Sequence, residues 1–579
     1  MLIIKIVAGL VFIVLAGCAG VSDIKDNGLG VANDVKESRK SVKADKITEI
    51  SPEVLYLLMT AEIAGQRNQY GVALDGYLQA AKRVDDVRVA ERAAKIGLFL
   101  KDTKKTDEAV SLWLKQDGEN LTARKIAALS ALKGNNKKLA VEHLNKILAD
   151  DPAGFEATLL ELTRLLGKEG KADFIFNVLE DIGHQHPKQA SVFFVQALLA
   201  GQLNRPETVK EKVNETLALQ PDWDKALILR AQVFAQTGKL DKARLDLERV
   251  LEKNPQNIKI RKMLGKVLMK ADALDEAIEA YQKVLETAPE DGESQFAIAI
   301  IYLQQKKEDD ALDYLKKLVN RPGWDAQASF YIGRIAFKNK QYEKALTWFD
   351  KVTQGPYEYD SAVAAISVLL SQKEYKEAEQ RLAKMPAKFP RHQLNIALLK
   401  AEIYSEQNQY QKAFDLLTEV LADYPGHRDL LYTRALIAEK IDRLDVLEHD
   451  LKKILSKKPD DAAVLNALGY TLADRTNRYD EAGKYLQKAL KLNPEEAVIM
   501  DSMGWLLFKQ GRMAESLGML RTAYEKLPEN EIAAHLAEIL WVMGRKAEAR
   551  DVFNKALINA PEDEYLLKLK KRISGIDDK

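Results

Sequence analysis

The sequence predicts an all-α protein, a right-handed superhelical solenoid of about fifteen helix-turn-helix repeats. Prolines recur along most of the chain at a nearly constant interval, and a small residue recurs at a fixed distance before many of them. The segments between prolines carry apolar residues at helical spacing beside charged ones. In such an array each repeat buries its apolar stripe only against its neighbours, so 579 residues form one continuous structure instead of about four closed domains.

The proline ladder sets the length of the repeat. Thirteen of the sixteen prolines lie on it, and successive members are separated by 33 to 35 residues. This period is typical of the tetratricopeptide repeat, a 34-residue pair of helices whose second helix ends at a proline. The ladder consists of Pro152, Pro187, Pro221, Pro255, Pro289, Pro322, Pro356, Pro390, Pro425, Pro459, Pro494, Pro528 and Pro561.

The interior of the repeats supports the same unit. In residues 256–289, Gly265 is expected at a close contact between the two helices, with Tyr281 and Val284 on the core side of the second helix. Twelve residues before the ladder proline, where the helices approach closely, there is room only for a small side chain. Ser516 occupies that position in one repeat. Alanine occupies it at Ala140, Ala243, Ala277, Ala378, Ala413, Ala482 and Ala549.

The repeat pattern divides the chain into segments. Residues 51–152 keep the rhythm without the prolines and are predicted to be degenerate repeats, with repeat ends near Asp85 and Gly118. Residues 153–561 form the regular array, in which single inserted residues lengthen turns such as the one at 473–482. Residues 562–579 are predicted to be a solvating C-terminal helix and a tail.

The N-terminus reads as a secretory signal followed by a lipid anchor. Residues 1–17 contain Lys5 and then an apolar run too short to span a bilayer. The junction Leu15-Ala16-Gly17-Cys18 resembles the bacterial lipobox, which implies cleavage between Gly17 and Cys18 and lipidation of Cys18, the only cysteine. The alternative is an incidental cysteine beside an ordinary cleavage site. Residues 18–50 are polar and are predicted to form a flexible tether.

Composition and motifs argue against several function classes. The 87 basic and 86 acidic residues leave a formal charge of +1, so the chain is not organised for nucleic acid. No phosphate-binding loop, nucleophile elbow or zincin motif occurs, so no enzyme activity, cofactor or metal is expected. His184 and His186 could hold a metal with a third ligand, but an exposed turn is the simpler interpretation.

A partner-binding surface is expected on the first helices of the repeats, whose second, fifth, ninth, twelfth and thirteenth positions line the concave face. Aromatic rings beside charges at these positions suit a polypeptide partner with apolar anchors. The alternative is that Tyr470 and Trp505 only pack between adjacent helices. The candidate positions in the two repeats before Pro528 are Asn466, Tyr470, Asp474, Asp501, Trp505, Phe508 and Lys509.

Two regions carry a more specific resemblance. The run from Leu55 to Gly97 and the run from Leu465 to Arg550 are similar to a family of proteobacterial outer-membrane lipoproteins built of these repeats. The family includes the binding partner of a carboxyl-terminal processing protease. The resemblance implies a lipid-anchored adaptor on the periplasmic face of the outer membrane, which binds this periplasmic serine protease and presents peptidoglycan hydrolases for degradation. Ala19 after the lipidated position fits outer-membrane sorting.

Two other functions remain open at this stage. One is a scaffold for an outer-membrane secretion or polysaccharide-export machine, for which co-purification of a pore-forming protein would be the discriminating result. The other is an envelope hydrolase, which would be supported by peptidoglycan cleavage that a single carboxylate substitution abolishes. The mixed-sign helices favour a scaffold, because they offer no defined pair of carboxylates for acid and base catalysis.

Overall fold

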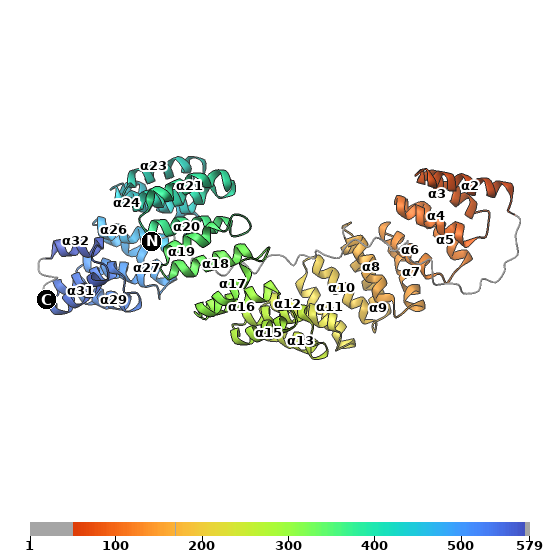
Figure 1. Ribbon diagram of the computed structural model, residues 1–579, viewed down its shortest axis with the longest axis horizontal. Helices are drawn as coiled ribbons and strands as arrows, with labels where there is room; N and C mark the ends of the chain where they lie inside the picture. Colours follow the sequence, from red (N-terminus) through yellow and green to blue (C-terminus); the bar gives the residue numbers. More distant parts are fainter. Residues whose placement is uncertain (1–49, 168, 574–579) are drawn as a thin grey trace. The chain divides into compact units, whose positions relative to one another are not determined.

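The computed structural model describes residues 50–167 and 169–573, and all regular structure in this part of the chain is helical. Two compact units are present, one ending at Trp324 and the other beginning at Asp325 (Figure 1). The predicted signal peptide, the lipidation at Cys18 and nearly all of the tether lie outside the described residues. None of the helices in the described ranges is both long and apolar enough to cross a membrane.

In its described residues the first unit contains eight pairs of helices. They are α2 (Pro52–Gln66), α3 (Tyr70–Ala81), α4 (Val87–Leu100), α5 (Thr103–Gln116), α6 (Leu121–Lys133), α7 (Lys137–Asp150), α8 (Phe155–Gly167), α9 (Ala172–Gln185), α10 (Ala190–Gln202), α11 (Pro206–Leu219), α12 (Asp224–Gln236), α13 (Leu240–Lys253), α14 (Ile258–Lys270), α15 (Leu274–Thr287), α16 (Gly292–Gln304) and α17 (Glu308–Leu318).

The second unit contains seven pairs and a final single helix. They are α18 (Asp325–Lys338), α19 (Tyr342–Asp350), α20 (Glu358–Ser371), α21 (Tyr375–Lys388), the short 3-10 helix η2 (Pro390–His392), α22 (Gln393–Glu406), α23 (Tyr410–Asp423), α24 (Arg428–Lys440), α25 (Leu444–Lys457), α26 (Ala462–Arg475), α27 (Tyr479–Leu492), α28 (Ala497–Lys509), α29 (Met513–Lys526), α30 (Asn530–Val542), α31 (Lys546–Asn559) and α32 (Glu564–Arg572).

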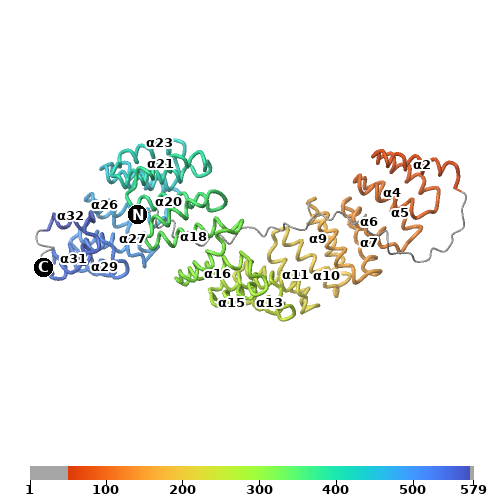
Figure 2. The backbone as a smooth tube through the Cα atoms, viewed as in Figure 1, coloured from red at the N-terminus to blue at the C-terminus, as the bar shows by residue number. Residues whose placement is uncertain are grey.

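In the described residues fifteen helical hairpins follow one another between α2 and α31, and α32 comes after them. Figure 2 traces the backbone through these helices. The predicted all-α repeat solenoid of about fifteen repeats is therefore confirmed. The first two degenerate repeats form the same hairpins without a ladder proline, and their second helices end at Ala81 and Gln116, close to the expected positions. The predicted C-terminal helix corresponds to α32, which is shorter than the segment 562–579 predicted for the helix and tail.

Each ladder proline follows the end of a second helix. The residue before proline is sterically disfavoured in the helical region, so the helix cannot continue through it. Asn254, which precedes Pro255, accordingly has φ −135° and ψ 78°, although its N–H still bonds to Val250 O. The proline ladder thus marks where one repeat ends and the next begins.

The turn within all but one of the described hairpins contains a residue in the left-handed conformation. Fourteen of the fifteen hairpins have one such residue, at intervals close to the repeat period. Glycine, asparagine and aspartate tolerate this conformation best, yet lysine fills it four times. The turn residues are Asn68, Lys101, Asn135, Gly170, Asn204, Gly238, Asp272, Lys306, Lys340, Lys373, Asn408, Asp442, Gly511 and Gly544.

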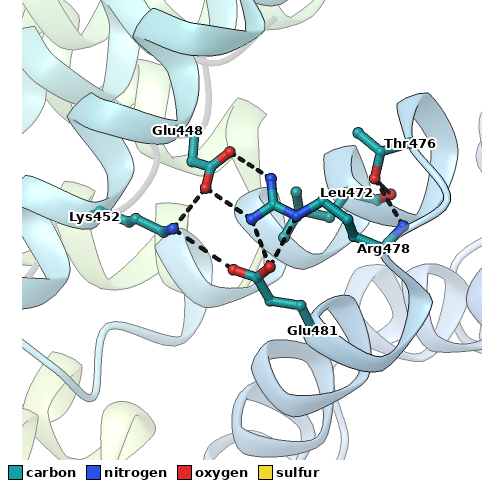
Figure 3. Close-up of polar contacts among 6 residues, drawn as sticks. All are labelled: Glu448, Lys452, Leu472, Thr476, Arg478 and Glu481. Atoms are coloured by element: carbon teal, nitrogen blue, oxygen red, sulfur yellow. Dashed lines mark hydrogen bonds and ion pairs between the residues drawn. The ribbon is translucent and has the colours of Figure 1, made fainter.

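The remaining hairpin, α26 and α27, contains the predicted lengthened turn. Thr476 is extended and its hydroxyl donates to Leu472 O at 2.6 Å, while Arg478 N donates to the same hydroxyl at 3.1 Å. The Arg478 guanidinium then bridges Glu448 of α25 and Glu481 of α27 (Figure 3). The hydrogen bonds from Arg478 outweigh partial burial and lower the pKa of Glu448 to about 2. In this turn, hydrogen bonds of the Thr476 and Arg478 side chains take the place of a left-handed residue.

Small residues allow the two helices of a hairpin to approach. A Cβ on Gly265 would lie 2.7 Å from the Tyr281 ring, which confirms the predicted close contact. All seven alanines twelve residues before a ladder proline are fully buried. At the equivalent position Ser516 is also buried, and its hydroxyl is satisfied by donating to Gly504 O at 2.7 Å.

Two glycines of one hairpin provide a matched test of this packing. A Cβ on Gly504 would lie 2.7 Å from Leu520 Cγ, so Gly504→Ala is expected to lower the free energy of unfolding by about 1–3 kcal/mol through overpacking. Gly518 in α29 has no heavy atom within 4 Å of an added Cβ. Because alanine is the better helix former, Gly518→Ala should raise the free energy of unfolding by about 0.5–1 kcal/mol. Urea unfolding of both variants measures the contrast, and equal effects would contradict it.

Candidate functional site

The seven candidate positions lie on α26 and α28, and the structure brings five of them into one polar network. The network occupies the surface on which the first helices α24, α26, α28 and α30 and the final helix α32 meet, called here the inner surface of the last repeats. Asp501 and Trp505 are only 4% and 2% exposed. Their predicted exposure is therefore wrong, because side chains of the following repeats cover them.

A buried acid and histidine pair is at the centre of the network. His535 Nδ1 of α30 lies 3.0 Å from both carboxylate oxygens of Asp501 in α28. Nδ1 can bond to the carboxylate only when it carries a hydrogen, so the aspartate fixes the protonation of this nitrogen. Both residues are buried, and a buried ion pair is stable only with such direct contact.

Trp505 covers this pair. Its ring stacks on the His535 ring with centroids 4.1 Å apart, and its indole Nε1 donates to Asp474 at 2.9 Å. Lys509 Nζ lies 3.5 Å from the same carboxylate and 5.1 Å from the Trp505 ring centroid. Phe508 packs beside Trp505 with ring centroids 5.1 Å apart. Trp505 thus packs between helices, as in the alternative interpretation of its position.

Tyr470 also packs inward. Its hydroxyl donates to Glu531 of α30 at 2.9 Å, which joins first helices two repeats apart. Asn466 is half-buried one turn earlier in α26. Of the seven candidates, Asn466 and Phe508 lie beside the network without a hydrogen bond to its members in the described residues. Whether any of the seven contacts a partner stays a prediction.

Longer contacts close the inner surface further. Lys440 of α24 lies 3.4 Å from Glu564 of α32, although 124 residues separate them. Arg572 of α32 lies 2.6 Å from Glu538 of α30. These two contacts link α32 to the first helices α24 and α30.

The network holds its charges in a low-dielectric setting, and this shifts several pKa values. Burial alone would lower the pKa of His535, but the charge and hydrogen bond of Asp501, helped by Glu531 and Asp474, raise it above 6.5. Burial raises the pKa of Glu531 and of Glu538. The charge of His535 opposes this in part at Glu531, and the charges of Arg572 and His535 oppose it in part at Glu538. The folded network thus retains protons that the unfolded chain would release.

This retention predicts a pH dependence of stability. A group whose pKa is higher in the folded chain than in the unfolded chain stabilises the fold fully at pH values below its unfolded pKa. That unfolded pKa is 6.5 for His535 and 4.5 for the two glutamates. The stabilisation is lost as the pH rises through the pKa of the folded state. Hydrogen exchange in α28 and α30 should therefore be faster at about pH 8 than at about pH 6, beyond the intrinsic increase. His535→Gln should reduce this difference, and an unchanged difference would contradict the prediction.

Sequence reasoning missed His535, Glu531 and Glu538 as members of the network. Asp501 and His535 are 34 residues apart, one repeat period, so an acid and a histidine at matching positions of successive repeats were a usable signal. His184 and His186 lie at the end of α9, where His186 Nε2 contacts Asn145 at 3.1 Å. Within the described ranges no group of three acidic, histidine or cysteine residues is arranged to hold a metal.

Comparison with known families supports the repeat assignment. Models described as "Tetratricopeptide repeat" match residues 194–258, 234–300, 268–329, 462–496 and 507–573. A model described as "Anaphase-promoting complex, cyclosome, subunit 3" matches residues 338–422. Neither description names a catalytic domain.

A relative that matches most of the chain is also found. The chain is 34% identical over 531 residues to the TPR repeat-containing protein PA4667 of Pseudomonas aeruginosa, covering 91% of this chain and 89% of that protein. Two solved structures resemble this chain more distantly. The APC/C hetero-tetramer Cut9-Hcn1 is 15% identical, with 78% of this chain and 90% of that chain covered and a TM-score of 0.33. A TPR protein of Thermus thermophilus, TTC0263, is 24% identical, with 30% and 94% covered and a TM-score of 0.28.

Proposed function

Because the chain belongs to the tetratricopeptide-repeat protein family that includes PA4667 of Pseudomonas aeruginosa, we propose that it is a membrane-anchored adaptor for other proteins. The observation that carries the proposal is the array itself, fifteen hairpins with no catalytic family among those matched. Such arrays serve as extended surfaces for protein partners. The coarser function, a scaffold for protein–protein interaction, follows from the family.

The proposed partner is a periplasmic carboxyl-terminal processing protease, and the proposed cargo is peptidoglycan hydrolases. The resemblance of residues 55–97 and 465–550 to lipoproteins of that kind supports this assignment. An anchored adaptor that holds protease and substrate together raises the effective concentration of each for the other. The adaptor then needs no chemistry of its own.

A reconstituted assay tests the adaptor function. Purified protease is mixed with a peptidoglycan hydrolase, with and without the Cys18→Ser chain, and loss of the hydrolase is followed over time. Faster loss with the chain is the expected result. The same mixture with a protease lacking its nucleophilic serine should show no loss, which excludes hydrolysis by the chain itself. Equal rates with and without the chain would contradict the proposal.

The membrane anchor is tested separately. Cys18→Ser removes the thiol to be lipidated, so the chain is expected to move from the membrane fraction to the soluble fraction on cell fractionation. Ala19→Asp is the matched control: it keeps the lipidated cysteine and should stay in the membrane, shifted from the outer to the inner membrane on a density gradient. A Cys18→Ser chain that remains in the membrane would refute the anchor.

A further inference from the structure

The inner positions of the two units differ in the sign of their charge. These are the positions predicted to line the concave face, and they lie 13, 10, 6, 3 and 2 residues before the left-handed turn residue of a hairpin. In the first unit ten of the described residues at these positions are basic and only three are acidic. The basic residues are Arg88, Lys95, Lys125, Lys133, Arg164, Lys225, Lys259, Lys262, Lys266 and Lys270, and the acidic residues are Glu62, Glu91 and Glu293.

The second unit has the opposite sign at its inner positions. Nine residues there are acidic and four are basic, with Asp474 of the lengthened hairpin included. The acidic residues are Asp360, Glu402, Glu406, Asp429, Glu439, Asp474, Asp501, Glu531 and Glu538, and the basic residues are Arg334, Lys338, Lys440 and Lys509. Because the whole chain has 87 basic and 86 acidic residues, the basic excess is a local property of the inner positions of the first unit.

Ion pairs between first helices show on which side these lysines lie. Lys225 Nζ of α12 lies 2.6 Å from Glu156 of α8, so it reaches past the intervening first helix α10. Lys262 and Lys266 of α14 each lie 2.6 Å from Glu293 of α16, the next first helix. The three lysines therefore lie along the row of first helices and not on the side of the second helices.

Helix α14 carries the densest part of this charge. Four of its inner positions are lysines, spaced three or four residues apart, so they form one stripe along the helix. Asp291 and Glu293 of the next repeat offset two of the four charges. Lys259 and Lys270 are exposed and form no ion pair with a residue that the structure describes. The stripe, called here the lysine face, consists of Lys259, Lys262, Lys266 and Lys270.

Apolar side chains occupy inner positions on the first helices before and after the lysine face. Ile228 of α12 and Phe296 and Ile300 of α16 are all half-buried, so part of each side chain is accessible. A polypeptide with acidic and apolar side chains matches both kinds of surface. A nucleic acid or a lipid headgroup layer would pair with the lysines but would leave the apolar side chains without a matching contact.

We propose that the lysine face binds an acidic, extended segment of a partner protein, whose apolar side chains contact Ile228 and Phe296. This inference rests on the proposed adaptor function, because the bound segment belongs to a protein that the adaptor holds. Complementary charge speeds the encounter with such a segment and excludes basic ones. Salt weakens the attraction, because exposed charges are screened over about 10 Å at 0.1 M ionic strength.

Fluorescence anisotropy tests this binding directly. The Cys18→Ser chain is titrated into a short fluorescein-labelled peptide in which glutamates alternate with leucines. A second peptide carries glutamine in place of every glutamate. The glutamate peptide is expected to bind, with an affinity that falls as salt is added, and the glutamine peptide is expected to bind far more weakly. Equal affinities for the two peptides would overturn the proposal.

Charge reversal locates the site on the chain. Lys259→Glu combined with Lys270→Glu reverses the two lysines that have no ion pair, so the affinity for the glutamate peptide should fall about tenfold. Lys146→Glu combined with Lys283→Glu is the matched control. These two lysines are also exposed, lie on the second helices α7 and α15, and form no ion pair within the described ranges. The control should bind the peptide as the parent chain does.

Glu293→Gln provides a change of the opposite sign. Glu293 pairs with both Lys262 and Lys266, so its neutralisation leaves two ammonium groups for the peptide. The affinity for the glutamate peptide should therefore rise about threefold. Helical circular dichroism of all variants should match that of the parent chain, which separates a change of charge from a loss of folding.

Two further results would overturn the proposal. One is an equal loss of affinity in the two double variants, since the net charge of the chain would then attract the peptide. The other is binding of phosphatidylglycerol vesicles through Lys259 and Lys270 by a chain that does not bind the glutamate peptide, which would assign the lysine face to a membrane. The peptide assay contains no protease. Peptide binding with a failed adaptor assay would therefore reject the adaptor function alone, and the reverse outcome would reject the lysine face alone.

Discussion

Replacing Asp501 with alanine is expected to lower the free energy of unfolding of the C-terminal unit by about 3–5 kcal/mol. The substitution leaves His535 buried with no carboxylate on Nδ1, so a protonated imidazole would be an uncompensated buried charge. The histidine escapes this only by losing its proton, and its pKa should fall below that in the wild-type chain. Urea unfolding measures the first effect, and the His535 resonances in NMR titration measure the second.

An exposed ion pair of the same unit serves as control. Asp551 and Lys555 of α31 lie 2.7 Å apart with both side chains largely in solvent. Asp551→Ala is expected to cost no more than about 0.5 kcal/mol, because water screens such pairs. If Asp501→Ala cost as little as Asp551→Ala, the acid and histidine pair would not be an organising element of the last repeats.

Replacing Trp505 with alanine should cost about 3–5 kcal/mol of stability, the typical loss for a large buried ring. The substitution removes the ring stacked on His535 and the indole donor to Asp474. A ring that served mainly to contact a partner in an open groove would behave differently: its loss would weaken partner binding and leave the unfolding midpoint unchanged. Denaturant unfolding therefore distinguishes the two interpretations of this residue.

Trp348 is the matched control for this prediction. It lies half-buried on α19, with Lys351 Nζ 3.6 Å from its ring centroid. Trp348→Ala also removes a tryptophan from the same unit but leaves a smaller cavity, so its destabilisation should be clearly less. Equal losses for the two variants would argue that Trp505 has no special place in the network.

The fold could be predicted because its determinants are local. Pro255 and its equivalents stop helices through a clash with the preceding residue, and Gly265 is needed where two helices of one hairpin meet. These effects act within one repeat and leave a periodic trace in the sequence. The left-handed turn residues were harder to identify, because Lys101 and Lys306 occupy a conformation that favours glycine and asparagine.

The site could be predicted only in part, because it depends on how successive repeats turn relative to one another. Position counting placed Tyr470, Asp501 and Trp505 on the exposed concave face, but Asp501 and Trp505 are buried. It did not predict that Tyr470 reaches Glu531 two repeats later, or that Lys440 reaches Glu564. Small rotations between repeats accumulate over several units, and they decide whether an inner surface is open or filled.

The closed inner surface of the last repeats also affects the order in which the protein acquires its structure. An array held together only by neighbours can fold one repeat at a time as the chain is made, since every contact is close in sequence. The contact between Lys440 and Glu564 spans 124 residues and forms only after the last helix has been synthesised. A chain truncated before α32 therefore lacks this contact, together with the packing of α32 against α30.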